Sequence, residues 1–363
     1  MPEGVEVIAF ADDLAVVVVD KSPESIQEKA SIAAETIESH LNTRRLLLAR
    51  EKTEAVILAG PRKLPNLEID VCGFKITPKG AMKYLGVWFG ANGSFTKHVN
   101  EITTKAMKTT MALSRIMPNI AGPNQESRKM LATLARSQVL YASSVWENAL
   151  KTKRDAKKVS AMDRILALRI IRAYKTVSGP AASAIANLPP LHLKVKERAR
   201  MEKGMNKETA RLILYQEWQA EWESESRGRW TYRLIPELGL WIKRNHGNVG
   251  YHLTQILTGH GCFQPYLYSR RKVDSASCIY CGAAEDTAEH TLFSCTRWDK
   301  ERQVLKKEME HKPTADNMVS YMLSSSTGWE GVKDMVVKIM QRKEEDERIR
   351  QAQNAQENSH QED

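Results

Sequence analysis

The chain has 363 residues, of which 42% are hydrophobic and 27% charged, and its formal net charge is +10. This composition is typical of a folded globular protein and argues against wholesale disorder. No run approaches the roughly 18 consecutive apolar residues of a membrane helix, and the N-terminus shows no secretory pattern, so we expect no membrane partner. The five cysteines are too few for a disulfide scaffold, and three of them lie within residues 278–295, which indicates metal binding in a reducing compartment.

The positive charge is concentrated in one block of the chain. Residues 101–200 contain 19 basic and 6 acidic side chains, whereas residues 1–50 contain 5 basic and 9 acidic ones. A concentrated positive segment attracts a polyanion through counterion release and electrostatic steering. An ordinary solvated helical surface is the alternative, but the concentration in one segment favours nucleic acid as the partner.

The first part of the chain is predicted to alternate short strands with one helix. Residues 5–20 contain two β-rich runs around Ala11, Asp12 and Asp13, which predicts a hairpin with two adjacent carboxylates at its turn. An amphipathic helix is predicted over residues 23–50, with Ser22 as its N-cap. Further strands are predicted at Glu54–Leu58, Leu67–Ile69, Phe74–Ile76 and Lys83–Phe89. This part is therefore expected to be α+β.

From residue 95 onward the apolar residues recur mostly at helical spacing. Helices are predicted at 125–149, 152–174, 181–187, 194–222, 299–311 and 328–350, the last two of them polar, and 227–268 is predicted to be loosely helical. The acidic run Glu344–Glu347 is interpreted as a solvated helix face. The sequence from Gln351 has almost no apolar content and is expected to fray.

Asp12 and Asp13 are a candidate metal-binding pair. Adjacent acids beside buried strands repel each other, so a protein that keeps such a pair usually neutralises it with cations. Hard oxygen ligands suit Mg²⁺, and two such ions can hold the attacking and leaving oxygens of phosphoryl transfer. On the dipeptide alone, a polar β-turn is the preferred interpretation.

A second candidate metal site is the spacing Cys278-x₂-Cys281-x₈-His290-x₄-Cys295. Three thiolates and one imidazole suit tetrahedral Zn²⁺, and four protein ligands leave no open position, so the zinc would be structural. Gly282 can take the turn after the second cysteine. Buried cysteines without a metal are the alternative, and the spacing favours zinc.

The basic run Arg270, Arg271 and Lys272 lies just before this cluster and can contact phosphates. The aromatic residues near the cluster are expected to pack around the metal rather than to stack on bases; they are Tyr280, Phe293 and Trp298.

The run Phe10 to Asp13, followed by an apolar strand, resembles the catalytic palm hairpin of reverse transcriptases. Lys52-Thr53 resembles the next palm motif, whose lysine approaches the phosphates of the incoming nucleotide. The run Tyr84, Leu85, Gly86 and Val87 resembles the hairpin that grips the primer end. The resemblance implies that Asp12 and Asp13 bind Mg²⁺ and that Lys52 assists at the phosphates, although Lys52 by itself would be an ordinary exposed lysine.

Later motifs narrow the family. Residues 186–191 (ANLPPL), residues 257–261 (LTGHG) and the Cys/His set resemble the segments beyond the thumb in non-LTR retrotransposons. Together they resemble the C-terminal half of the open reading frame of type-1 insect elements that insert into ribosomal DNA. The implied α+β organisation is the C-terminal part of a palm (1–95), a basic helical thumb (96–178), a helical connector (179–260), a CCHC zinc-knuckle region (261–315) and a polar helical or disordered tail (316–363).

The function that this resemblance implies is RNA-directed DNA polymerisation by two-metal nucleotidyl transfer, primed at a nicked target. Its partners would be an RNA template, target DNA and deoxynucleotides, and its compartment the nucleus. The family's fingers, first palm aspartate and endonuclease have no counterpart in this sequence, so we expect a fragment that does not polymerise DNA alone. Template-dependent incorporation that Asp12→Ala abolishes would contradict this expectation. The alternatives are a non-enzymatic nucleic-acid-binding zinc protein and a decayed transposon copy.

Overall fold

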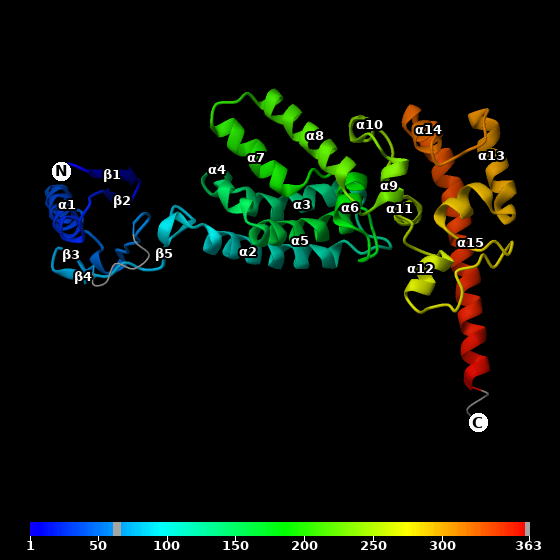
Figure 1. Ribbon diagram of the computed structural model, residues 1–363, viewed down its shortest axis with the longest axis horizontal. Coiled ribbons are helices and arrows are strands. Elements are labelled where there is room, and N and C mark those ends of the chain that lie inside the picture. The colour runs from blue at the N-terminus through cyan, green and yellow to red at the C-terminus, as the bar shows by residue number, and fades with distance from the viewer. Residues whose placement is uncertain (61–66, 360–363) are drawn as a thin grey trace. The chain divides into compact units, whose positions relative to one another are not determined.

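A computed structural model describes residues 1–60 and 67–359 of the chain (Figure 1). The chain divides into two compact units. One unit comprises Met1–Ile102 with Val145–Ala156, and the other comprises Thr103–Ser144 with Lys157–Asp363. The described residues form helices and small sheets, which confirms the predicted α+β class. No described helix combines the length and the apolar character that crossing a bilayer requires.

A β-hairpin opens the first unit. Strand β1 (Val5–Phe10) pairs antiparallel with β2 (Asp13–Val18), and Phe10 lies opposite Asp13. The turn therefore consists of Ala11 and Asp12, with Ala11 at a positive φ of 53°. The predicted hairpin is confirmed.

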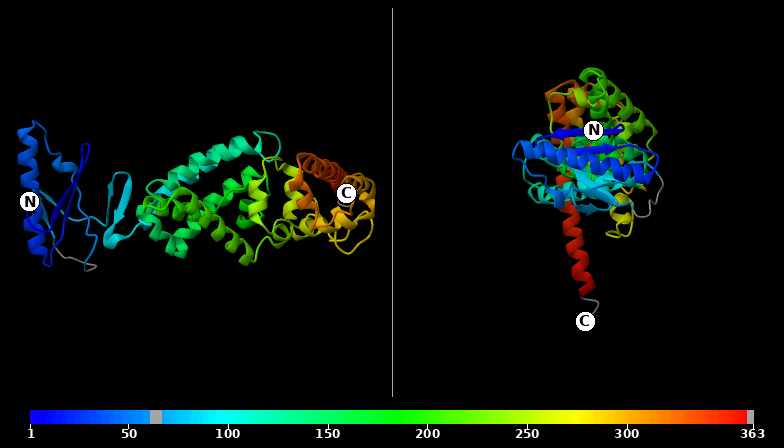
Figure 2. Two further views of the ribbon diagram at one scale, coloured as in Figure 1. Left: turned by 90° about the horizontal axis from the view of Figure 1, so that it is seen from above. Right: turned by 90° about the vertical axis from the view of Figure 1, so that its left-hand side faces the viewer.

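Helix α1 (Pro23–Thr43) packs beside this hairpin (Figure 2). The side chain of Ser22 accepts a hydrogen bond from the backbone N–H of Ser25 at 3.1 Å, so the predicted N-cap is confirmed. Ala33 and Ala34 are the residues that α1 buries, because small side chains allow close approach to the strands. The helix ends at Thr43 rather than at residue 50.

The remaining strands form two more hairpins: β3 (Ile69–Val71) with β4 (Phe74–Ile76), and β5 (Ala81–Tyr84) with β6 (Val87–Gly90). The prediction of one strand over Lys83–Phe89 is wrong, because Leu85 and Gly86, at φ 45° and 82°, reverse the chain. The strand predicted at Glu54–Leu58 is also wrong. Backbone oxygens of Ala55 and Ile57 accept single hydrogen bonds from Lys79 and Asn92, which do not form a ladder. Of the predicted strand Leu67–Ile69, only Ile69 belongs to β3.

The second unit is built from helices, together with parts of α2 and α5 that continue from the first. The bounds are α2 (Thr96–Ile116), α3 (Gln125–Leu140), α4 (Ser143–Trp146), α5 (Lys153–Ile170), α6 (Gly179–Ala186), α7 (Leu191–Glu202), α8 (Lys207–Ser224), α9 (Arg229–Leu234), α10 (Leu238–Lys243), α11 (Tyr251–Thr258) and α12 (Gln264–Ser269). Two predicted helices are shorter than expected. The helix over 125–149 ends at Leu140, and the helix over 194–222 is interrupted where Gly204 takes a φ of 96° and Asn206 caps α8.

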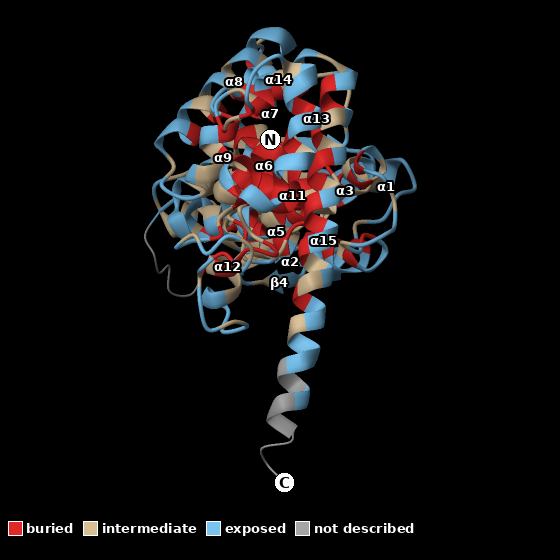
Figure 3. Ribbon diagram, turned by 90° about the vertical axis from the view of Figure 1, so that its right-hand side faces the viewer, coloured by how far each residue is buried: buried red, intermediate tan, exposed pale blue. Residues whose placement is uncertain are grey.

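Three helices close the chain: α13 (Asp299–Met309), α14 (Met318–Ser324) and α15 (Ser326–Ser359). The N-terminal half of α15 buries Trp329, Val332, Val336 and Ile339, in the red core of Figure 3. The prediction of a polar helix over 328–350 is therefore wrong for this half. Helix α15 continues to Ser359, and the fraying expected from Gln351 stays a prediction.

Candidate metal centre

The four predicted zinc ligands lie on a short loop and the helical turn that follows it. Gly282, at a φ of 72°, turns the chain after the first two cysteines, and its N–H donates to the Cys278 oxygen at 2.9 Å. A π-helical turn, η4 (His290–Ser294), then presents the histidine. Cys295 follows at its end, and its N–H donates to the His290 oxygen at 2.8 Å. Backbone hydrogen bonds therefore position the ligands at both ends of the loop.

The ligand atoms of Cys278, Cys281, His290 and Cys295 all lie within 4.8 Å of one another. The Sγ atoms of Cys278 and Cys295 are 3.7 Å apart, and the Cys281 Sγ is 3.3 Å from the His290 Nε2. The cysteines are free thiols. A tetrahedral zinc with Zn–S bonds of about 2.3 Å places its sulfur ligands about 3.8 Å apart. The arrangement therefore fits one zinc ion held by four protein ligands.

The protonation of these side chains also matters to the metal. Burial raises the pKa of the Cys278 thiol and raises that of Cys295 to about 12. The backbone N–H of Ala283 lowers the pKa of Cys281, and burial lowers that of His290. Without a cation the two buried cysteines are thiols, and at neutral pH the imidazole is neutral. Metal binding would therefore release protons, and the bound ion would stabilise the thiolates. With four protein ligands, zinc would hold the loop together without offering an open coordination position.

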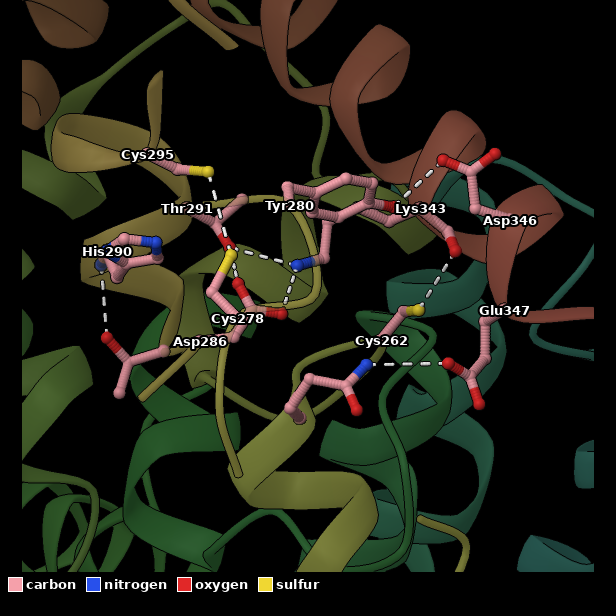
Figure 4. A network of polar contacts seen from close by, with 12 residues as sticks. Cys262, Cys278, Tyr280, Asp286, His290, Thr291, Cys295, Lys343, Asp346 and Glu347 are labelled. Carbon is pink, nitrogen blue, oxygen red and sulfur yellow. Dashed lines mark hydrogen bonds and ion pairs between the residues drawn. The ribbon is translucent and has the colours of Figure 1, made fainter. Parts of the chain in front are cut away.

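A layer of buried polar side chains surrounds the ligand loop (Figure 4). Asp286 lies between Cys281 and His290 in the sequence, and its side chain is fully buried. Its carboxylate accepts from the Thr291 hydroxyl at 2.8 Å and from the Lys343 ammonium at 2.5 Å. The Lys343 side chain is only 1% exposed and comes from α15. The loop and α15 are thus joined by a buried ion pair.

Sequence reasoning missed this layer. Lys343 continues the apolar stripe of α15, at helical spacing from Val336 and Ile339, and a lysine on an apolar stripe is a signal for a buried partner. The interpretation of Glu344–Glu347 as a solvated face holds for Glu345, which is exposed, but is wrong for Glu347, and Glu344 and Asp346 are partly buried. The Glu344 carboxylate accepts from Gln255 at 2.6 Å, and Glu347 is buried.

The residues predicted to act in polymerisation lie in the first unit. Asp12 is in the turn of the β1–β2 hairpin, Asp13 begins β2, and both are exposed. Lys52 ends the short helix η1 (Arg50–Lys52) and is exposed. The predicted primer-contacting run forms the turn of the β5–β6 hairpin: Tyr84, Leu85, Gly86 and Val87. In the described residues these hairpins belong to separate two-stranded sheets, and no third Asp, Glu, His or Cys joins Asp12 and Asp13 in a metal-binding group.

The predicted nucleic-acid contacts beside the metal loop are accessible. Arg270, Arg271 and Lys272 are all exposed, and Arg270 lies 5.5 Å from the Tyr266 ring. The aromatic residues of the cluster pack inward, as expected. Phe293 and Trp298 are buried, and the Tyr280 ring meets the Trp298 ring edge-on at 5.1 Å.

Comparison with known proteins shows similarity to transposable-element proteins. No protein-family model matches it. No solved structure gives a significant match. A Pol polyprotein from the type-1 retrotransposable element R1 2 of Nasonia vitripennis is 26% identical over an alignment of 330 positions, which covers 83% of this chain and 80% of the relative. The Pol polyprotein from element R1 4 of the same species is 24% identical over an alignment of 369 positions, which covers 90% of this chain and 92% of the relative.

A longer relative is the putative 115 kDa protein in the type-1 element R1DM of Drosophila melanogaster. It is 24% identical over 313 residues, and the match covers 79% of this chain but 30% of the relative. The chain is therefore similar, over most of its length, to proteins of type-1 retrotransposable elements. More narrowly, homologues over most of the chain are R1 Pol polyproteins, which confirms the predicted resemblance to type-1 retrotransposon Pol proteins. The names of these relatives say nothing of insertion into ribosomal DNA.

Proposed function

We propose that the chain takes part in reverse transcription as a segment of a retrotransposon Pol polyprotein, and that its partners are nucleic acids. The similarity to R1 Pol polyproteins over 83–90% of the chain supports this most strongly. The exposed basic run beside a four-ligand Cys/His cluster agrees with it. Because reverse transcription of this kind uses a chromosomal DNA target, the chain would act in the nucleus.

In this proposal the reaction is RNA-directed DNA synthesis primed at a target DNA end. Asp12 and Asp13 would bind Mg²⁺, which neutralises charge on the reacting phosphate. Lys52 would assist at the phosphates of the incoming nucleotide, and residues 84–87 would hold the primer end. Asp12 in the turn and Asp13 at the start of β2 are both exposed, which supports their role because neither carboxylate is buried by neighbouring protein groups.

The binding part is tested with the full chain and a fluorescent DNA primer annealed to an RNA template. We expect binding whose affinity falls steeply as salt rises, because cationic side chains displace counterions from phosphates. Fluorescence anisotropy over about 50–200 mM salt measures this slope. Affinity that is absent, or that does not change with salt, would contradict the proposal.

The metal part is tested by replacing Mg²⁺ with Fe²⁺ and mapping peroxide-driven backbone cleavage in the presence of template–primer. We expect cleavage near residues 12–13 that added Mg²⁺ suppresses. Asp12→Asn and Asp13→Asn should each weaken it, whereas Glu6→Gln, an exposed carboxylate on the same hairpin, should not. Equal cleavage in all three variants would rule out this site.

A further inference from the structure

Helix α15 contacts several elements through a short run of consecutive residues (Figure 4). Lys343 binds Asp286, and the Asp346 carboxylate accepts from the Tyr280 hydroxyl at 3.0 Å. Tyr280 lies between the ligands Cys278 and Cys281 in the sequence. This stretch of α15 therefore touches the metal loop at two separate points.

Neighbouring residues of the same run contact other helices. Glu344 accepts from Gln255 on α11, and Glu347 accepts from Gln264 on α12 at 3.4 Å. The Cys262 thiol lies 3.4 Å from the Lys343 backbone oxygen. One turn of α15 is thus the point at which α11, α12 and the metal loop meet.

Asp286 is, like Tyr280, a loop residue that contacts this part of α15, and it forms the ion pair. Its backbone N–H donates to the Ala276 oxygen at 3.0 Å, just before the first ligand, and its carboxylate binds Thr291, just after His290. The position of this carboxylate therefore depends on both halves of the ligand loop. A bound metal would hold these halves together and would thereby hold the carboxylate in its place opposite the Lys343 ammonium.

We propose that metal binding at the Cys/His cluster and docking of the α15 segment 343–347 are linked, with Lys343 and Asp286 as positioning residues. The proposal rests on the zinc assignment of the cluster. Burying an ammonium without its carboxylate is strongly unfavourable, so displacement of Asp286 should release Lys343 and the turn around it. Linkage is reciprocal, so loss of Lys343 should weaken metal binding by the same factor by which metal strengthens docking.

The first test measures zinc affinity of the full chain by competition with a chromophoric chelator. Lys343→Met and Asp286→Asn should each raise the zinc dissociation constant about 10–100-fold, the range seen when groups that orient metal ligands are removed. Lys338→Met is the matched control, because Lys338 is exposed on the same helix. It should change the dissociation constant less than about twofold.

The double variant Asp286→Asn/Lys343→Met separates linkage from general damage. Because the two side chains act as a pair, the zinc dissociation constant of the double variant should be no higher than that of the single variant with the higher constant. If the increase in the zinc dissociation constant of the double variant equals the product of the two single-variant increases, the two residues do not act as a pair. Wild-type chain that binds no zinc would overturn both the metal assignment and the linkage. Zinc binding that Lys343→Met leaves unchanged would overturn the linkage alone.

The second test measures the amide hydrogen-exchange rates of α15 in the zinc-loaded chain, with and without a chelator. Removing zinc should accelerate exchange of amides 340–350 at least tenfold, while amides 329–336 keep their protection because apolar packing holds them. Equal protection of 340–350 in both states would overturn the proposal. Loss of protection along the whole helix would also overturn it, because the effect would then be general unfolding.

Discussion

The guanidinium of Arg302 on α13 donates a hydrogen bond to the backbone oxygen of Cys295, the last of the four predicted metal ligands. The same guanidinium lies 3.4 Å from the backbone oxygens of Thr291 and Leu292, and the side chain is only 7% exposed. A single charged group thus donates to two carbonyls of the π-helical turn and to the carbonyl of Cys295, which directly follows it. The shape of this turn therefore depends on a helix that follows it in the sequence.

Replacing Arg302 tests this role. Arg302→Met should lower the free energy of opening of residues 290–296 by about 2–3 kcal/mol, because several buried carbonyls lose a charged donor. Hydrogen exchange of amides in this turn measures the change. Lys306→Met, an exposed substitution on the same helix, should alter it by less than about 0.5 kcal/mol. If the two variants behave alike, Arg302 does not stabilise the turn.

The zinc assignment predicts a spectroscopic result. Titration with Co²⁺ should give one ion per chain, with the intense visible bands of a tetrahedral site that includes thiolates. Cys278→Ser should weaken these bands and lower the zinc affinity at least tenfold. Cys262→Ser, which changes a buried cysteine outside the cluster, should leave the metal stoichiometry unchanged. A six-coordinate cobalt spectrum would contradict the assignment.

His98 predicts a pH dependence of stability in the first unit. Burial lowers its pKa to about 4, and its Nδ1 accepts from the Trp88 N–H at 3.3 Å. In the unfolded chain the histidine pKa is about 6.5, so between about pH 4 and pH 6.5 the unfolded chain binds more protons at this residue than the folded chain does. Stability should therefore be complete above about pH 6.5 and fall toward pH 4, by on the order of 3 kcal/mol at most.

Hydrogen exchange of the Trp88 amide across this pH range measures the effect. His98→Gln keeps an acceptor for the amide but cannot titrate, so its pH dependence should be flatter than that of the wild type. His40→Gln, an exposed position in the same unit, should keep the wild-type slope. An unchanged slope in His98→Gln would assign the pH dependence to other groups.

The basic run before the metal loop predicts a salt effect. The triple variant Arg270→Gln/Arg271→Gln/Lys272→Gln should bind RNA more weakly and lose about two units of the salt slope, because up to three phosphate contacts disappear. The matched control is Lys300→Gln/Lys306→Gln/Lys307→Gln, which removes the same charge from exposed positions. If both triple variants lose the same slope, net charge rather than this run determines binding.

Features with local signals could be predicted from the sequence. The hairpin at Asp12, the Ser22 cap and the Cys/His cluster each depend on residues close together in the chain, so spacing is enough to identify them. The error at Glu54–Leu58 has a different cause. Its apolar run suits a strand, but among residues 1–60 and 67–359 no segment forms a continuous ladder with it, and β-propensity reflects such context.

The polar layer around the metal loop could not be predicted in the same way. Lys343 and Asp286 are 57 residues apart, and no periodic pattern connects them. The four charges that follow Lys343 made this part of α15 resemble a surface, although its contacts with α11, α12 and the loop place it in the interior. Pairing over such a distance is a property of tertiary packing.

That separation also sets an order of events during synthesis. The metal loop leaves the ribosome dozens of residues before Lys343, so a nascent chain can acquire its ion while Asp286 still faces water. The turn of α15 that carries Lys343 would then dock against a loop that has already folded. If the loop binds its ion at that stage, α15 would complete the interior of this region after the metal has ordered the loop surface that α15 contacts.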